Sequence, residues 1–211
     1  NHALLANTTG DRNVAMGALA LDANTTADGN TAVGYNSLSS NTTAEVNTAI
    51  GFQALRLNTT GGSNTSVGAN ALGANTTANN NTAVGSSALL ANTTGEDNVA
   101  LGYAALRDNT TASNNTAVGY FALEANTTGG NNVALGKNAL SANLTGTLNV
   151  AVGYNSLDAN TNGNHNTALG YNTLGAQNFG SATDSYNTAV GSAAGAAVTT
   201  GVQNTLIGGL A

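Results

Sequence analysis

Apolar and polar positions recur along this chain with a period of seventeen residues. A five-residue element, Asn-Thr/Val-Ala-Val/Leu-Gly, ends at a glycine that returns at this spacing in ten successive units: Gly17, Gly34, Gly51, Gly68, Gly85, Gly102, Gly119, Gly136, Gly153 and Gly170. We number each unit from the Asn of this element, so that the glycine is position 5. A fixed short period predicts a solenoid, in which each unit is one coil that buries its apolar face against its neighbours.

Two columns of large aliphatic residues indicate where the core lies. Position 9 is Leu in ten successive coils, from Leu21 to Leu174, and position 4 is apolar in every coil: Met16, Val33, Ile50, Val67, Val84, Leu101, Val118, Leu135, Val152, Leu169, Val190 and Ile207. Positions 2 to 4 are rich in β-branched residues and end at glycine, which is typical of a short strand followed by a turn. We expect positions 4 and 9 to meet across a thin coil.

Strand alternation then places Ala at position 3 and Gly at position 5 on the face opposite to positions 2 and 4. This smooth Ala/Gly face has two interpretations. It is either a surface that another chain approaches closely or a tight inward corner of the coil.

The period is interrupted once, because Gly170 and Gly191 are twenty-one residues apart before the spacing of seventeen returns at Gly208. A four-residue insertion within 175–186 that leaves later units in phase indicates a loop on one coil. The sequence therefore predicts one all-β domain over 1–211, a parallel β-solenoid of about twelve coils whose last coil, 192–211, is divergent. The chain opens in mid-coil, so we expect a processed product or an excerpt from a longer array.

Two columns of Asn run along the predicted rod. Position 1 is Asn in all twelve elements, from Asn13 to Asn204, and we interpret it as a ladder of amides bonded from coil to coil. Position 12 is also Asn, and nine of its members lie in Asn-x-Thr sequons. Two interpretations remain for it, an internal amide ladder or N-glycosylation. The sequon asparagines are Asn7, Asn24, Asn41, Asn58, Asn75, Asn92, Asn109, Asn126 and Asn143.

Position 6 carries most of the aromatic residues and is the candidate ligand or partner surface. Five of the six tyrosines lie there, together with one phenylalanine: Tyr35, Phe52, Tyr103, Tyr120, Tyr154 and Tyr171. They occur as neighbouring pairs separated by coils with Ala69, Ser86 or Lys137. We expect each pair to stack. The strip serves either the stability of the stack or the binding of sugars or a neighbouring chain.

Composition narrows the function classes. Only 7% of residues are charged, the net charge is −6, and there are four basic residues, so we expect neither nucleic acid nor anionic membrane as a partner. No apolar run is long enough to insert into a bilayer. The two histidines, His2 and His165, lie about nine coils apart, and no nucleophile, zinc or phosphate-binding motif is present. We therefore predict no enzyme activity, no catalytic or metal site and no cofactor.

The motif resembles a known family. The elements Asn98-Val-Ala-Leu-Gly102, Asn132-Val-Ala-Leu-Gly136 and Asn149-Val-Ala-Val-Gly153 are similar to the repeated strand motif in the heads of trimeric autotransporter adhesins. The unit over 115–129 resembles repeats of bacterial and phage tail-fibre-like surface proteins. The resemblance implies a left-handed parallel β-roll, a form of β-solenoid, commonly trimeric, that projects from a cell or virion surface and adheres to host matrix, cells or glycans. The adhesin heads have shorter repeats, and no binding residue carries over.

We therefore expect an extracellular structural or adhesive fibre segment that associates with itself as a homotrimer. The alternative is a subunit of a filament stacked end to end, which the apolar stretch 192–211 favours. Two lesser alternatives are a glycan-binding module and an ice-binding protein. Ice binding suits a flat face with Thr on alternate residues, whereas pairs such as Thr25-Thr26 are adjacent.

Overall fold

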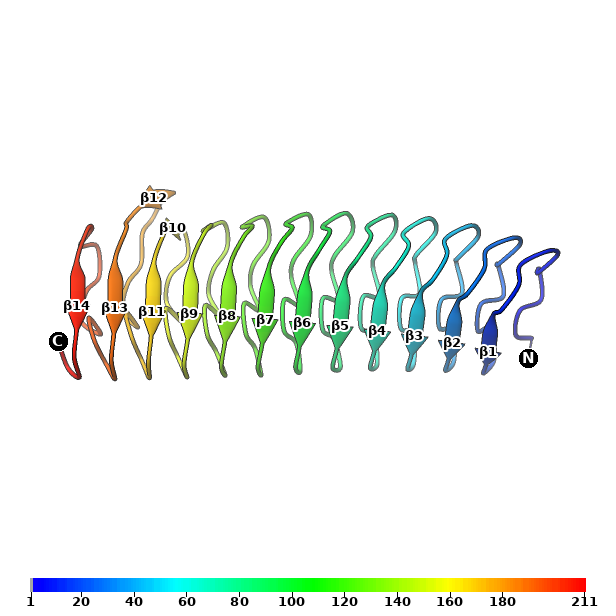
Figure 1. Cartoon of the computed structure of the whole chain (residues 1–211), viewed down its shortest axis with the longest axis horizontal. Helices are drawn as coiled ribbons and strands as arrows, with labels where there is room; N and C mark the ends of the chain where they lie inside the picture. The colour runs from blue at the N-terminus through cyan, green and yellow to red at the C-terminus, as the bar shows by residue number, and fades with distance from the viewer. Residues whose placement is uncertain (1) are drawn as a thin grey trace.

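The computed structural model describes residues 2–211 as a rod of stacked coils (Figure 1). Twelve short strands form one parallel sheet along the rod, and two more strands form a small second sheet. The part of the chain that the structure describes contains no helix. The prediction of an all-β parallel solenoid is therefore confirmed. The strands are β1 (Val14–Met16), β2 (Thr31–Val33), β3 (Thr48–Ile50), β4 (Thr65–Val67), β5 (Thr82–Val84), β6 (Val99–Leu101), β7 (Thr116–Val118), β8 (Val133–Leu135), β9 (Val150–Val152), β10 (Gly163–Asn164), β11 (Thr167–Leu169), β12 (Thr183–Asp184), β13 (Thr188–Val190) and β14 (Thr205–Ile207).

The register of the large sheet follows the sequence period. Each strand pairs with the residues seventeen positions further on, as in Thr82↔Val99 and Ala83↔Ala100. The insertion does not interrupt this sheet, since β11 pairs directly with β13. The inserted residues instead form β12, which pairs with β10 above the start of the main strands (Figure 1). The insertion therefore lies outside the main sheet, on one coil.

The strands face the opposite way from the prediction. Ala at position 3, such as Ala83, Ala100 and Ala117, is 0% exposed, whereas position 4 points outward, with Leu135 45% exposed. The expectation of a position 4 core is therefore wrong. Leu at position 9 is fully buried, as predicted, and it fills the thin interior so that only a methyl group fits opposite it. Of the two interpretations of the Ala/Gly face, the inward corner is correct and the outward partner surface is wrong.

Position 5 places two requirements on its residue, and only glycine meets both. Its φ lies between +126° and +139° in every coil, a region that L side chains rarely adopt. A Cβ on Gly85 would also run into the backbone carbonyl of Gly102 in the next coil. The repeated glycine is therefore fixed by the turn and by the close stacking of coils.

Positions 7, 9 and 17 of the coil also have left-handed backbone, for example Asn36 (φ 59°) and Leu38 (φ 50°) at the first two. The N–H of Asn36 donates to Ala18 of the preceding coil, at 2.9 Å, and the N–H of Leu38 donates to Ala54 of the following coil, at 3.0 Å. The alternating backbone therefore aims donors in both directions along the rod. These bonds offset the unfavourable left-handed geometry of a leucine.

The other half of the coil interior is polar and is filled by the two Asn columns. The Asn13 Oδ1 accepts the backbone N–H of Asn30 at 2.9 Å, and the Asn24 Nδ2 donates to the Asn7 Oδ1 at 2.9 Å. Within one coil, the carbonyl of Ala44 accepts from Nδ2 of both Asn30 and Asn41, at 2.9 and 3.0 Å. Both columns are ladders, and the ladder interpretation of positions 1 and 12 is confirmed.

Candidate functional site

The aromatic residues at position 6 lie on the surface, and each predicted pair stacks. The ring centroids of Tyr35 and Phe52 are 5.6 Å apart, those of Tyr103 and Tyr120 are 5.3 Å apart, and those of Tyr154 and Tyr171 are 5.7 Å apart. Their planes differ by 16° or less. All six side chains remain 42% to 58% exposed. The rings stack face to face along the rod axis, so their faces are covered by each other and their edges are exposed to solvent.

Lys137 joins two of these pairs into a longer surface. Its ammonium lies 5.6 Å from the ring centroid of Tyr120 and 5.7 Å from that of Tyr154. Contacts at this distance are cation–π interactions. We call the resulting run over five coils the aromatic strip: Tyr103, Tyr120, Lys137, Tyr154 and Tyr171. Lys137 stands at position 6 and so in the sequence it separates the pairs, but in space it bridges them.

Phe121 is a member of this surface that sequence reasoning missed. It is half-buried at position 7, and its ring meets Tyr120 at 4.1 Å and Tyr103 at 5.5 Å, in tilted and edge-on contacts. The sequence contains a signal for this residue, because the other coils from Asn36 to Ala193 carry small or polar residues at position 7. The contacts fix the rings of the Tyr103 pair on the surface.

The outer face of the main sheet lies two residues before the aromatic column and is uncharged. It consists of the Thr or Val of position 2 and the aliphatic residues of position 4. Exposed members in mid-rod include Ile50, Val133 and Leu135, at 39% to 45%. Exposed apolar residues that lie together make this face the candidate interaction surface. We call positions 2, 4 and 6 together the contact face.

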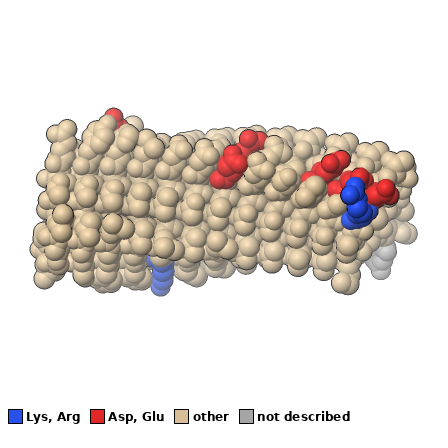
Figure 2. Space-filling view, viewed as in Figure 1, with Lys and Arg blue, Asp and Glu red and all other residues tan. Residues whose placement is uncertain are grey.

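The acidic side chains and the arginines stand at positions other than 2, 4 and 6, and several of them pair with each other. Figure 2 shows how few charged side chains lie on one side of the rod. Arg12 pairs with Asp28 at 3.0 Å, and Arg107 pairs with Asp108 at 2.7 Å and also with Glu124. The backbone N–H of residue 11 and the guanidinium of Arg12 lower the pKa of the Asp28 carboxyl. The carboxylate of Asp108 raises the pKa of Arg107. Surface pairs of this kind contribute little to stability.

Burial weighs against the glycosylation interpretation of position 12. Asn109, for example, is 0% exposed, and its Nδ2 donates to the Asn92 Oδ1 and to the carbonyl of Ala112. A sugar on this nitrogen would replace a hydrogen bond and need space that the next coil occupies. Burial therefore favours the ladder for the members from Asn24 to Asn143, and glycosylation stays a prediction. Asn7, in the first coil, is partly exposed.

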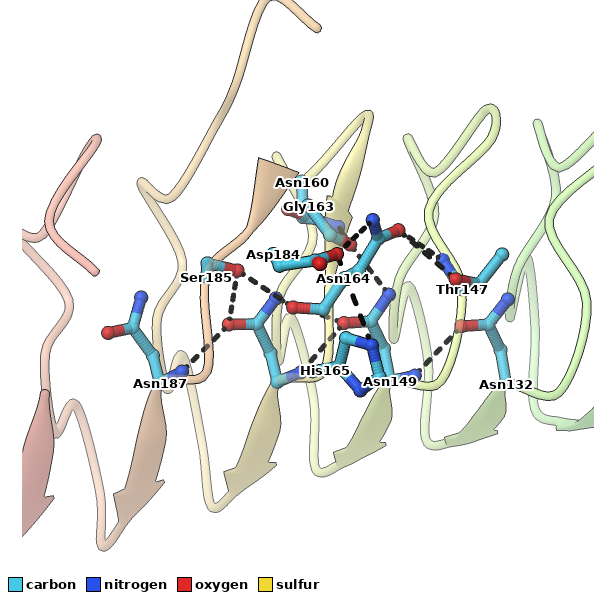
Figure 3. Close-up of polar contacts among 11 residues, drawn as sticks. Asn132, Thr147, Asn149, Asn160, Gly163, Asn164, His165, Asp184, Ser185 and Asn187 are labelled. Carbon is cyan, nitrogen blue, oxygen red and sulfur yellow. Dashed lines mark hydrogen bonds and ion pairs between the residues drawn. The ribbon is translucent and has the colours of Figure 1, made fainter. Parts of the chain in front are cut away.

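The insertion forms a polar cluster, separate from the contact face, that the sequence did not predict (Figure 3). The rings of His165 and Tyr186 stack at 4.7 Å, and the His165 Nε2 lies 4.0 Å from the Asp184 carboxylate. Asn164 donates to the same carboxylate at 3.0 Å. His165 and Tyr186 both immediately precede a position 1 Asn, so aligning the coils at that column would have revealed the stack.

The described residues, 2–211, offer few features of other kinds of site. Among them no three His, Cys, Asp or Glu side chains converge as metal ligands would, and no pocket is found. His2 and His165 belong to coils far apart along the rod. No helix in this range is long and apolar enough to cross a membrane. Comparison with protein-family models, curated proteins and solved structures gives no significant match.

Proposed function

We propose that this chain is a segment of an extracellular fibre, in which the stacked coils supply a rigid rod and the contact face supplies adhesion. The observation that carries the proposal is the unbroken coil-to-coil register from β1 to β14. Successive coils are bonded through the backbone and through the Asn ladders of positions 1 and 12, so the rod resists bending and local opening. A rod with a partly apolar side that carries only one charged residue, Lys137, suits attachment along its length.

The rows of Thr at position 13 add to this rigidity. The hydroxyls of Thr59, Thr93 and Thr110 each donate to a carbonyl of the next coil, at 3.0 to 3.1 Å. The adjacent Thr of position 14 is exposed instead. Adjacent Thr residues therefore divide between an internal ladder and the surface, and this supports a structural role for one of each pair.

Localisation tests the proposal. Antibody raised against the folded chain should label thin projections on intact cells or particles of the source, by immunogold electron microscopy. The same antibody on lysed material gives the total amount of antigen. Antigen that is reached only after lysis would overturn the extracellular proposal.

A filament of stacked chains is the second candidate. The outer edges of β1 and β14 carry the hydrogen-bonding groups that join the internal strands, so either edge accepts a further coil of the same chain or of another copy. Ile207, on β14, is 71% exposed. Electron microscopy of rod length over a hundredfold range of protein concentration distinguishes a filament of stacked chains from a rod of fixed length. Only end-to-end stacking makes the rods longer as the concentration rises.

A further inference from the structure

The order of large and small residues along the contact face carries an inference about its partner. At position 6 the main sheet presents, from β2 to β14, two aromatics, two small residues, two aromatics, a lysine, two aromatics and two small residues. These residues are Tyr35, Phe52, Ala69, Ser86, Tyr103, Tyr120, Lys137, Tyr154, Tyr171, Ser192 and Gly209. The small members leave notches between the projecting rings.

We propose that the contact face binds a second copy of this chain in antiparallel orientation, with a two-fold axis through β7. This axis lies parallel to the strands, so each coil meets a coil of the partner and position 6 meets position 6. Tyr154 and Tyr171 then face the partner's Ser86 and the partner's Ala69. Phe52 and Tyr35 face Ser192 and Gly209 of the partner subunit.

The centre of the pairing is consistent with this register. Tyr120 meets the partner's Tyr120 on the axis, and the Lys137 ammonium meets the ring of the partner's Tyr103. Moving one copy by a single coil destroys the fit. In one direction Phe52 would meet the partner's Tyr171, and in the other Tyr103 would meet the partner's Tyr154. The proposed register therefore has a single meeting of aromatic rings, on the axis, whereas each shifted register has two or more because every off-axis meeting occurs twice.

The two sheet columns do not select a register. At position 2, Thr48 faces the partner's Thr188, but Thr82 faces the partner's Val150. At position 4, Val67 faces the partner's Leu169, whereas Leu101 faces the partner's Leu135. The register therefore rests on the order of residues at position 6.

The size and charge of the face fit a stable dimer. With strands about 4.8 Å apart, the contact face is about 50 Å long, and the three-residue strands with the row of position 6 side chains beside them make it about 15 Å wide. It therefore buries on the order of 800 Å² on each partner, the area of a standard interface. Lys137 is the one charged residue in the three columns, and a partner ring faces it. A two-fold interface uses the same patch on both copies.

Antiparallel pairing has a functional consequence, which rests on the proposed fibre function. Rods that project from two facing surfaces meet in opposite directions. Pairing of this geometry would therefore join like cells or particles through copies of the same chain. The partner for adhesion is then this protein itself.

The small residues at position 6 allow a substitution that tests the interface without disturbing the fold. Ala69→Tyr places a ring where the partner's Tyr171 lies, and the fold tolerates Tyr at position 6 because five other coils carry it. Sedimentation equilibrium should give a dimer of 20.6 kDa chains for the wild type and a dissociation constant raised about tenfold or more for Ala69→Tyr. The double variant Ala69→Tyr/Tyr171→Ala should restore the dimer. A wild-type monomer or trimer, or a dimer that Ala69→Tyr leaves unchanged, would overturn the proposal.

Cross-linking tests the orientation, since the chain contains no cysteine. With a short bismaleimide, Tyr120→Cys should cross-link to itself, and Tyr35→Cys should not. Ser192→Cys and Phe52→Cys should cross-link only when mixed. Efficient self-linkage of Tyr35→Cys would indicate a parallel assembly and overturn the two-fold arrangement.

Beads that carry the chain by one end test the adhesive role separately. Wild-type beads should aggregate with each other, and Ala69→Tyr beads should stay dispersed. If the free chain dimerises but its beads do not aggregate, adhesion between like surfaces is overturned while the dimer stands. The immunogold experiment judges the fibre proposal independently.

Discussion

Asn109 offers a test of the internal amide ladder that also separates it from glycosylation. Its Nδ2 donates to the Asn92 Oδ1 at 2.9 Å and to the Ala112 carbonyl at 3.0 Å, and its Oδ1 accepts from the Asn126 Nδ2 at 2.8 Å. Asn109→Ala removes these three bonds in a site with no exposure. The Asn92 Oδ1 is then left buried without a partner.

The size of the effect follows from this inventory. Each of the three lost hydrogen bonds costs about 1 kcal/mol net, and a stranded buried acceptor adds about 1–2 kcal/mol, so we expect a loss of about 4–5 kcal/mol in the free energy of unfolding. The matched control is Thr111→Ala, which destroys the same sequon but changes an exposed side chain. It should alter stability by less than about 0.5 kcal/mol.

Urea unfolding followed by circular dichroism measures both variants, and hydrogen exchange over residues 92–126 shows whether the loss is local. Local measurement matters because cooperativity can break down in long repeat arrays. Equal stability of Asn109→Ala and wild type would refute the ladder argument. A large effect of Thr111→Ala in protein from its natural source, with none in protein from a host that does not glycosylate, would show that the sequon is used.

Three further substitutions test other parts of the structure. Gly102→Ala should cost about 3 kcal/mol or more in urea unfolding because of its positive φ and the carbonyl of Gly119, whereas Gly180→Ala, with no atom within 4 Å of the new Cβ, should be nearly neutral; equal effects would contradict the stacking argument. Ala134→Leu should cost about 1–3 kcal/mol by overpacking, and Leu135→Ala less than about 1 kcal/mol, and the reverse order would return position 4 to the core. Asp158 has a buried Oδ1 without a hydrogen-bond partner, and desolvation raises the pKa of its carboxyl group above 3.8. Burial of the ionised carboxylate therefore destabilises the fold fully at pH values above the folded-state pKa and not at all below the unfolded-state pKa. Asp158→Ser, which copies Ser141 of the preceding coil, should therefore raise the midpoint of thermal unfolding at pH 7 and lose this advantage near pH 3; no gain at pH 7 would contradict the burial argument.

The period predicted the solenoid, the position of the insertion, the buried Leu column at position 9 and the stacked aromatic pairs. The strand orientation could not be read from the pattern, because positions 3 and 4 are both apolar and alternation alone does not say which face is inside. The decision comes from Leu38 and its equivalents, whose left-handed backbone turns the bulky side chain into a coil too thin for a second large residue. A leucine with positive φ is uncommon, so local propensity gives no warning of it. The bridging role of Lys137 and the fit between copies likewise depend on which columns face outward.

Adhesion under flow measures the central claim most directly. Beads coated with the wild-type chain should resist detachment by shear from a surface that carries the ligand of the contact face, with immobilised wild-type chain as the first surface to use. The matched beads carry Tyr103→Ser, Tyr120→Ser and Tyr154→Ser together, which should leave the circular dichroism spectrum unchanged because these side chains are exposed and Ser occupies the same position in two other coils. We predict that the variant beads detach at a much lower shear than the wild-type beads. Equal retention of both kinds of bead would contradict a contact face built on the aromatic strip.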